Sequence, residues 1–218
     1  MRYRHRGLSP TVDQSAYVAP TAVLSGDVRI GPGSAIGFGA VLTAEDGTIE
    51  IGRDCVVMET AVIRAGRHAP VRIGNHVLIG PRAYLTGCTI EDNVFLATGA
   101  TVFNHAVVGA GAEVRINGVV HLRTRLAADA TVPIGWVAVG DPAAILPPDR
   151  HEEIWAIQKP LDFPKVVFGL ARPAEGQSIM PEPDPALCQV PRGASRRRSA
   201  RVTTLPPGNG GRRRARVS

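Results

Sequence analysis

Apolar side chains recur along this chain at every sixth position. The series starts at Val18, Leu24 and Ile30 and runs, with two interruptions, to Leu126 and Val132. A helix would space apolar residues three and four apart, and a half-buried strand would alternate them with polar ones. A period of six fits neither. It predicts short strands joined by tight turns and wound into a parallel β-helix of triangular cross-section, with three hexads in each coil.

The two interruptions fall at residues 43–50 and 64–72, which we predict to be loops that leave the coil. Nineteen apolar positions predict just over six coils. They occupy residues 18–147, after an N-terminal lead-in at 1–17. Glycine often follows the apolar residue, and we expect it there because glycine accepts the positive φ of a tight corner.

The pattern changes after residue 147. Residues 149–158 begin with acidic side chains and contain Ile154, Trp155 and Ile157, which predicts a short capping helix ended by Pro160. Residues 148–170 are therefore expected to hold this helix and a surface segment. Residues 171–218 are rich in Pro, Gly, Ser and Arg and poor in apolar residues, which predicts a disordered tail.

The whole chain has a net charge of +6. The tail has ten arginines and three acidic residues, a net charge of +7, so residues 1–170 have a net charge of −1. An arginine-rich tail can bind nucleic acid through the phosphates, or it can be a solvated segment without function. Both interpretations stay open.

Composition also narrows the cellular setting. No apolar run is long enough to span a bilayer, and no apolar segment follows the basic N-terminus, so we expect a cytoplasmic protein that does not enter a membrane. The three cysteines are odd in number and share no metal-ligand spacing, which indicates reduced thiols.

Three motifs add to the six-residue frame. They are VAPTAVLSGDVRIG at 18–31, LTGCTI at 85–90 and GDPA at 140–143. With them, residues 8–158 resemble the gamma-class carbonic anhydrase family. The resemblance implies an all-β fold, a left-handed parallel β-helix of hexapeptide repeats with a short C-terminal α-helix. It also implies a homotrimer that holds zinc between neighbouring subunits through three histidines and hydrates CO2.

The resemblance places the three zinc ligands at Arg64, Pro81 and Thr86, none of which is histidine. Proline has no donor atom, a neutral threonine hydroxyl is a poor zinc ligand, and arginine carries a permanent positive charge. Val56 and Met58 stand where the family usually has polar residues that support the metal. We therefore expect that zinc binding and CO2 hydration are lost, and we predict no cofactor.

Other histidines offer little replacement chemistry. His68 lies in the second loop beside the expected metal site, and His105 is the candidate general base if the chain is an enzyme. Both are weak candidates, because a lone histidine in a repeat protein is more often a solvent-facing or corner residue.

Four arginines crowd the region of the lost ligands: Arg64, Arg67, Arg72 and Arg82. They predict either a patch that binds a small anion or acidic partner, or ion pairs between subunits with Asp46, Glu59 or Glu91. The function that follows is a non-catalytic trimeric scaffold or a binding protein for a small ligand, such as an anion or a siderophore. The alternative is a CoA-dependent acyltransferase of the hexapeptide-repeat superfamily.

Overall fold

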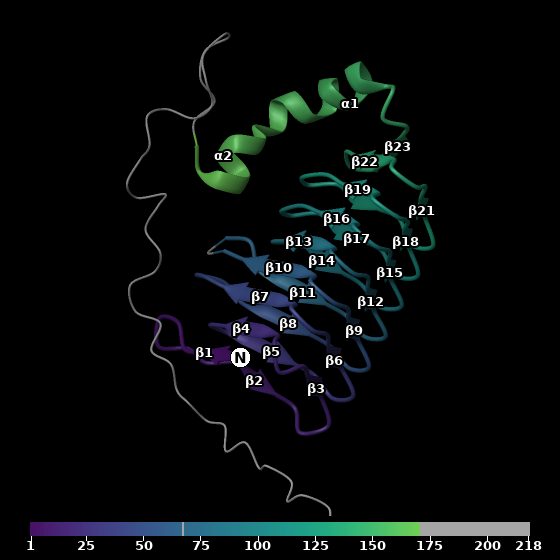
Figure 1. Cartoon of the computed structure of the whole chain (residues 1–218). Helices are drawn as coiled ribbons and strands as arrows, with labels where there is room; N and C mark the ends of the chain where they lie inside the picture. The colour runs from purple at the N-terminus through teal and green to yellow at the C-terminus, as the bar shows by residue number, and fades with distance from the viewer. Residues whose placement is uncertain (67, 171–218) are drawn as a thin grey trace, which may run out of the picture.

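The chain folds into a parallel β-solenoid of about eight turns, with short helices at its C-terminal end (Figure 1). This computed structural model is described for residues 1–66 and 68–170. Arg67 and the arginine-rich tail therefore lie outside the described residues. The predicted all-β fold, a parallel β-helix with a short C-terminal helix, is confirmed.

Three sheets form the sides of the solenoid. The first sheet contains β1 (Arg2–Tyr3), β4 (Val23–Ser25), β7 (Val41–Ala44), β10 (Val62–Ala65), β13 (Tyr84–Thr86), β16 (Thr101–Val102), β19 (Val119–Val120), β22 (Val137–Val139) and β23 (Ala144–Leu146). The second contains β2 (Thr11–Val12), β5 (Val28–Ile30), β8 (Ile49–Ile51), β11 (Val71–Ile73), β14 (Thr89–Ile90), β17 (Val107–Val108) and β20 (Arg125–Leu126). The third contains β3 (Tyr17–Val18), β6 (Ala35–Ile36), β9 (Val56–Val57), β12 (Leu78–Ile79), β15 (Phe95–Leu96), β18 (Glu113–Val114) and β21 (Thr131–Val132).

The apolar residue of each hexad points into the solenoid and stacks on its counterpart in the next coil. In the first sheet Ile63 pairs with Leu42 on one side and with Leu85 on the other, and Leu85 pairs with Val102. All four side chains are fully buried. The core is therefore a set of aliphatic columns, which explains why a strict period of six residues specifies this fold.

The solenoid begins earlier than the expected boundary at residue 18. β1 pairs with β4 and β2 pairs with β5, so residues 1–17 form a first coil rather than a lead-in. The sequence hid this coil because β1 consists of Arg2 and Tyr3 and carries no aliphatic residue.

The expected reason for the glycines was wrong. The glycines that follow the apolar residue do not have positive φ; that conformation occurs two residues further on, at corners that also hold non-glycine residues such as Asp54 and Asn117. Gly31 instead lies against the next coil, where an added Cβ would sit 2.5 Å from the Gly52 carbonyl oxygen. Close approach between coils requires glycine at this position.

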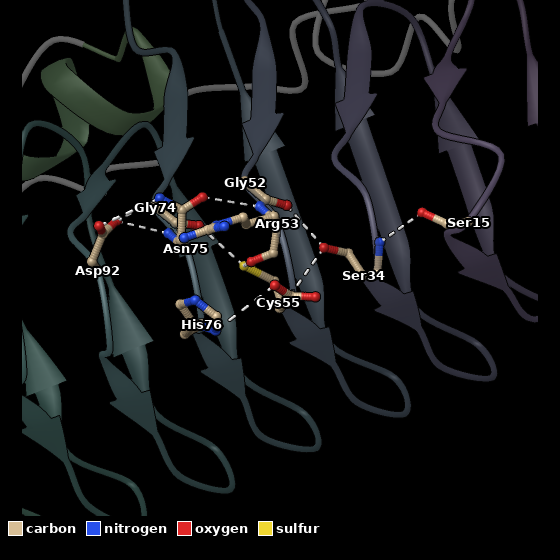
Figure 2. Close-up of polar contacts among 11 residues, drawn as sticks. Ser15, Ser34, Gly52, Arg53, Cys55, Gly74, Asn75, His76 and Asp92 are labelled. Atoms are coloured by element: carbon tan, nitrogen blue, oxygen red, sulfur yellow. Dashed lines mark hydrogen bonds and ion pairs between the residues drawn. The ribbon is translucent and has the colours of Figure 1, made fainter.

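Side chains at the corner between the second and third sheets connect the coils (Figure 2). The backbone N–H of Cys55 donates to the Ser34 hydroxyl at 3.0 Å, and that hydroxyl donates to the Gly52 carbonyl at 2.8 Å. Further along, the N–H of Asn75 donates to Asp92 Oδ1 at 2.7 Å. These polar residues satisfy backbone groups that the tight turns leave unpaired, and we assign them a structural role.

The C-terminal part leaves the coil at β23, which pairs antiparallel with β22. It continues as α1 (His151–Gln158), the 3-10 turn η1 (Lys159–Leu161) and α2 (Phe163–Phe168). The predicted capping helix is confirmed. In the part of the chain that the structure describes, no helix is long and apolar enough to cross a membrane.

Candidate functional site

The centre of the candidate site is a line of outward-facing side chains on the first sheet. Arg64 of β10 pairs in register with Thr43 of β7 and with Thr86 of β13. The next two coils continue the line with Phe103 and His121, which follow β16 and β19 directly. We call these five residues the outer column. Each occupies the same hexad position, directly after a buried apolar residue.

An ion pair fixes the guanidinium of Arg64. Glu45 lies in the loop after β7, and its Oε1 accepts a hydrogen bond from Arg64 Nη2 at 2.7 Å. This hydrogen bond is the main cause that raises the pKa of Arg64, and Tyr84 adds a smaller contribution. Both charged side chains are about half exposed, so water weakens the pair. The sequence predicted ion pairs for Arg64 with other acids in a neighbouring subunit; within one chain its partner is Glu45.

Pro81 lies at the other end of the first sheet's strands. It precedes β13, whereas Thr86 ends that strand. Pro81 and Met58 line a cavity of about 520 Å³ on the third sheet, with Phe95, Ile116 and Ile134 in the same wall. The structure therefore brings two of the three expected ligand positions together and leaves the third at a different corner of the chain.

Arg72 and Arg82 do not join Arg64 within one chain. Arg72 faces outward from the second sheet, with its Nε 4.0 Å from Glu50 Oε2. Arg82 is exposed at a positive-φ corner just before β13. Arg67 lies outside the described residues. Among the described arginines, Arg64, Arg72 and Arg82 could share an anion patch only across more than one copy of the chain.

The two histidines singled out from the sequence are both exposed. His68 lies in the loop between β10 and β11. His105 stands at a positive-φ corner, and partial burial and the nearby Arg123 charge lower its pKa. Equivalent positive-φ corners recur along the solenoid, so a structural role at a corner explains His105 without a catalytic role.

Sequence reasoning did not single out His121. The side chain is only 7% exposed, and its Nδ1 has no hydrogen-bond partner in the structure. Burial lowers the pKa of His121 to about 4, so the imidazole is neutral near pH 7. One signal could have found it: His121 follows Val120 in the same frame in which Arg64 follows Ile63.

The donor set of the outer column does not fit zinc. A guanidinium and a threonine hydroxyl occupy the two adjacent ligand positions, and a cation placed there would meet the fixed positive charge of Arg64. Among residues 1–66 and 68–170, no group of three or more His, Cys, Asp or Glu side chains could hold a metal ion.

Comparison with known proteins now identifies the class. Residues 70–104 match the family model described as bacterial transferase hexapeptide (six repeats). The acyltransferase LpxA from Bacteroides fragilis shares the fold, with a TM-score of 0.54, 20% identity and 60% of each chain covered. The protein is a hexapeptide-repeat β-solenoid.

Sequence relatives narrow this class. Gamma carbonic anhydrase 1, mitochondrial, from Arabidopsis thaliana is 37% identical over 69% of this chain and 57% of its own length. The probable carbonic anhydrase of Methanocaldococcus jannaschii is 34% identical over 42% of this chain and 57% of its own length. The chain thus spans less than two thirds of the curated relatives that it matches. It belongs to the gamma-carbonic-anhydrase-like family of hexapeptide-repeat proteins.

Proposed function

We propose that this protein keeps the gamma-carbonic-anhydrase-like scaffold without its metal and acts as a non-catalytic binding protein. The observation that carries the proposal is the Arg64 guanidinium, which stands beside Thr86 and is held by Glu45. A permanent positive charge at this position opposes zinc, and without zinc no hydroxide is available to attack CO2.

We propose further that the protein assembles as a homotrimer. Large apolar side chains are exposed on the side of the solenoid that contains the third sheet and the corner after it: Tyr17, Phe38, Val56, Phe95, Ile116 and Ile134. A row of this kind extending over several coils is a liability on a monomer and is typical of an interface. A second copy seated on it would also cover the cavity beside Pro81 and could bring that corner to the outer column of its neighbour.

The ligand that suits the outer column is a small anion. Arg64 uses one nitrogen on Glu45 and presents further N–H donors, and about two fifths of its side chain is exposed. A carboxylate or similar oxyanion can accept two parallel hydrogen bonds from a guanidinium. Because Glu45 already compensates the charge, we expect weak binding.

Elemental analysis of the purified protein, together with its mass by light scattering, tests this function. We expect a trimer without stoichiometric zinc, and stoichiometric zinc would refute the proposal. The matched variant Arg64→His/Pro81→His/Thr86→His should gain zinc if the ligand positions are correct. A thermal-shift titration with acetyl-CoA distinguishes the binding protein from the acyltransferase alternative, because a clear rise in Tm would favour the acyltransferase.

A further inference from the structure

Four rings gather at the Phe103–His121 end of the outer column, and we call them the aromatic box: Tyr84, Phe103, His121 and Phe163. The Phe163 ring, at the start of α2, meets Phe103 edge-on with 5.0 Å between ring centroids. It also lies over His121 at 5.6 Å, and the Phe103 and His121 rings are 5.9 Å apart. The Tyr84 ring lies 6.2 Å from that of Phe103. Two side chains of the outer column, Phe103 and His121, thus hold one ring that comes from a different part of the chain.

The box contains a polar group that its present occupant cannot satisfy. His121 is more than nine-tenths buried, and its Nδ1 has no hydrogen-bond partner. An unsatisfied buried nitrogen destabilises the folded state, and Phe163 brings only carbon atoms to it. Such a group in a folded protein calls for a specific explanation. A ligand with a polar substituent beside its ring would supply one.

Helix α2, which carries Phe163, buries little of its own surface. α2 has six residues, of which only Pro164 is buried. Asp162 before it and Gly169 after it both have positive φ, at 50° and 71°. A short helix between two such joints can leave the sheet without disturbing the aliphatic columns inside the solenoid.

The box is continuous with the anion-binding end of the column. Thr86 separates Phe103 from Arg64, so the two lie two strands apart, or about 9.6 Å between their backbones. Tyr84 links the two ends, because it contributes to the raised pKa of Arg64 and its ring adjoins Phe103. An arginine side chain that leaves Glu45 and turns toward Thr86 can span part of this distance.

We propose that the column from Arg64 to His121 is a binding site for a small aromatic carboxylate. The carboxylate meets Arg64, and the ring takes the place of Phe163 between Phe103 and His121. Phe163 is then an intramolecular stand-in for the ligand's ring, and α2 is the lid that carries it. The carboxylate contact rests on the anion binding proposed above, whereas the ring site stands on the aromatic geometry alone.

The test uses the full-length protein and benzoate as the probe, with acetate and benzyl alcohol as matched controls for the charge and the ring. Binding is followed by isothermal titration calorimetry and by the NMR shifts of the His121 ring. Benzoate should bind more tightly than either control, and 4-hydroxybenzoate, whose ring hydroxyl can hydrogen-bond the unsatisfied His121 Nδ1, should bind more tightly than benzoate. Phe163→Ala should raise benzoate affinity about tenfold if the lid is closed nine-tenths of the time. Phe168→Ala, which removes a ring that meets Phe163 edge-on at 5.9 Å, should loosen the lid and raise the affinity less than Phe163→Ala does.

Phe163→Leu provides a second variant that keeps the box filled, and it should raise the affinity less than Phe163→Ala. If acetate and benzoate bind equally and Phe163→Ala changes neither, the ring site is refuted while the anion function stands. If benzyl alcohol binds as well as benzoate and Arg64→Gln has no effect, the ring site stands and the anion contact is refuted. If no probe binds to the wild type or to Phe163→Ala, both proposals are refuted.

Discussion

Arg64 and Thr86 are register partners on adjacent strands, and the guanidinium of Arg64 is held 2.7 Å from Glu45. A fixed organic cation thus stands where the family resemblance places two metal ligands. This relationship sets the first prediction.

The Arg64–Glu45 pair should contribute little to stability. Both side chains are about half exposed, and exposed pairs contribute about 0.2–1 kcal/mol. A double-mutant cycle with Arg64→Gln and Glu45→Gln, measured by urea denaturation, should give a coupling energy within that range that shrinks in high salt. A coupling above about 2 kcal/mol would mean that the pair is shielded from water, for example by a neighbouring subunit.

Two kinds of glycine should respond differently to substitution. At Gly80 an added Cβ would lie 2.7 Å from the Ala97 backbone carbon, so Gly80→Ala should destabilise strongly because the coils would have to separate. At Gly135 the space is open and only φ is unusual, at 70°, so Gly135→Ala should cost about 1–2 kcal/mol.

Gly135→Asn serves as the matched control, because asparagine already occupies equivalent corners at Asn93 and Asn117. It should cost less than Gly135→Ala in the same thermal-denaturation experiment. If Gly80→Ala were tolerated as well as Gly135→Asn, the close approach between coils would not limit the fold.

Stability should fall when the pH is lowered from about 6.5 to about 4, in part because of His121. Burial lowers the pKa of this imidazole from 6.5 to about 4 in the folded protein. Between these values the unfolded chain binds a proton that the folded chain does not, so acid favours unfolding. The contribution is at most about 1.4 kcal/mol per pH unit and vanishes above pH 6.5.

His121→Phe removes this titration and keeps an aromatic ring in the box. Its free energy of unfolding should therefore depend less on pH than that of the wild type within this window. Identical pH profiles for the two proteins would mean that water reaches His121 in the folded state.

The two cysteines in the described residues should be unreactive until the protein unfolds. Burial raises the pKa of the Cys55 thiol and raises that of Cys88 to about 12, so little thiolate forms near neutral pH. In a Cys188→Ser variant, which leaves only these two thiols, alkylation should be slow in buffer and fast in denaturant. Fast labelling in buffer would show that the coils open locally.

The interior could be predicted from the sequence because every hexad repeats one physical requirement. Ile63, Leu85 and Val102 each fill the same place in successive coils, so a single period fixes both the strand and its register. The hydrophobic period did not predict the first coil. Its strand β1 has no aliphatic residue, and its pairing with β4 depends on backbone hydrogen bonds that leave no trace in the hydrophobic pattern.

The candidate site could be predicted only in part. The resemblance singled out Arg64 and Thr86, and their shared place in the frame put them on one face. The partner of Arg64 was not predictable, because Glu45 lies in a loop whose path has no periodicity. The aromatic box was missed for a related reason: Phe163 is 42 residues away from His121 in sequence, and no repeat connects them.

The sequence by itself determined the solenoid, its aliphatic columns and the absence of histidine at the expected ligand positions, because each of these is a property of single residues in a fixed repeat. Only the tertiary structure decided that Arg64 is held by a loop carboxylate, that Pro81 lies at a different corner, and that α2 places a phenyl ring on a neutral, buried histidine. These depend on how non-repeating segments return to the sheet, and packing rather than periodicity sets that path.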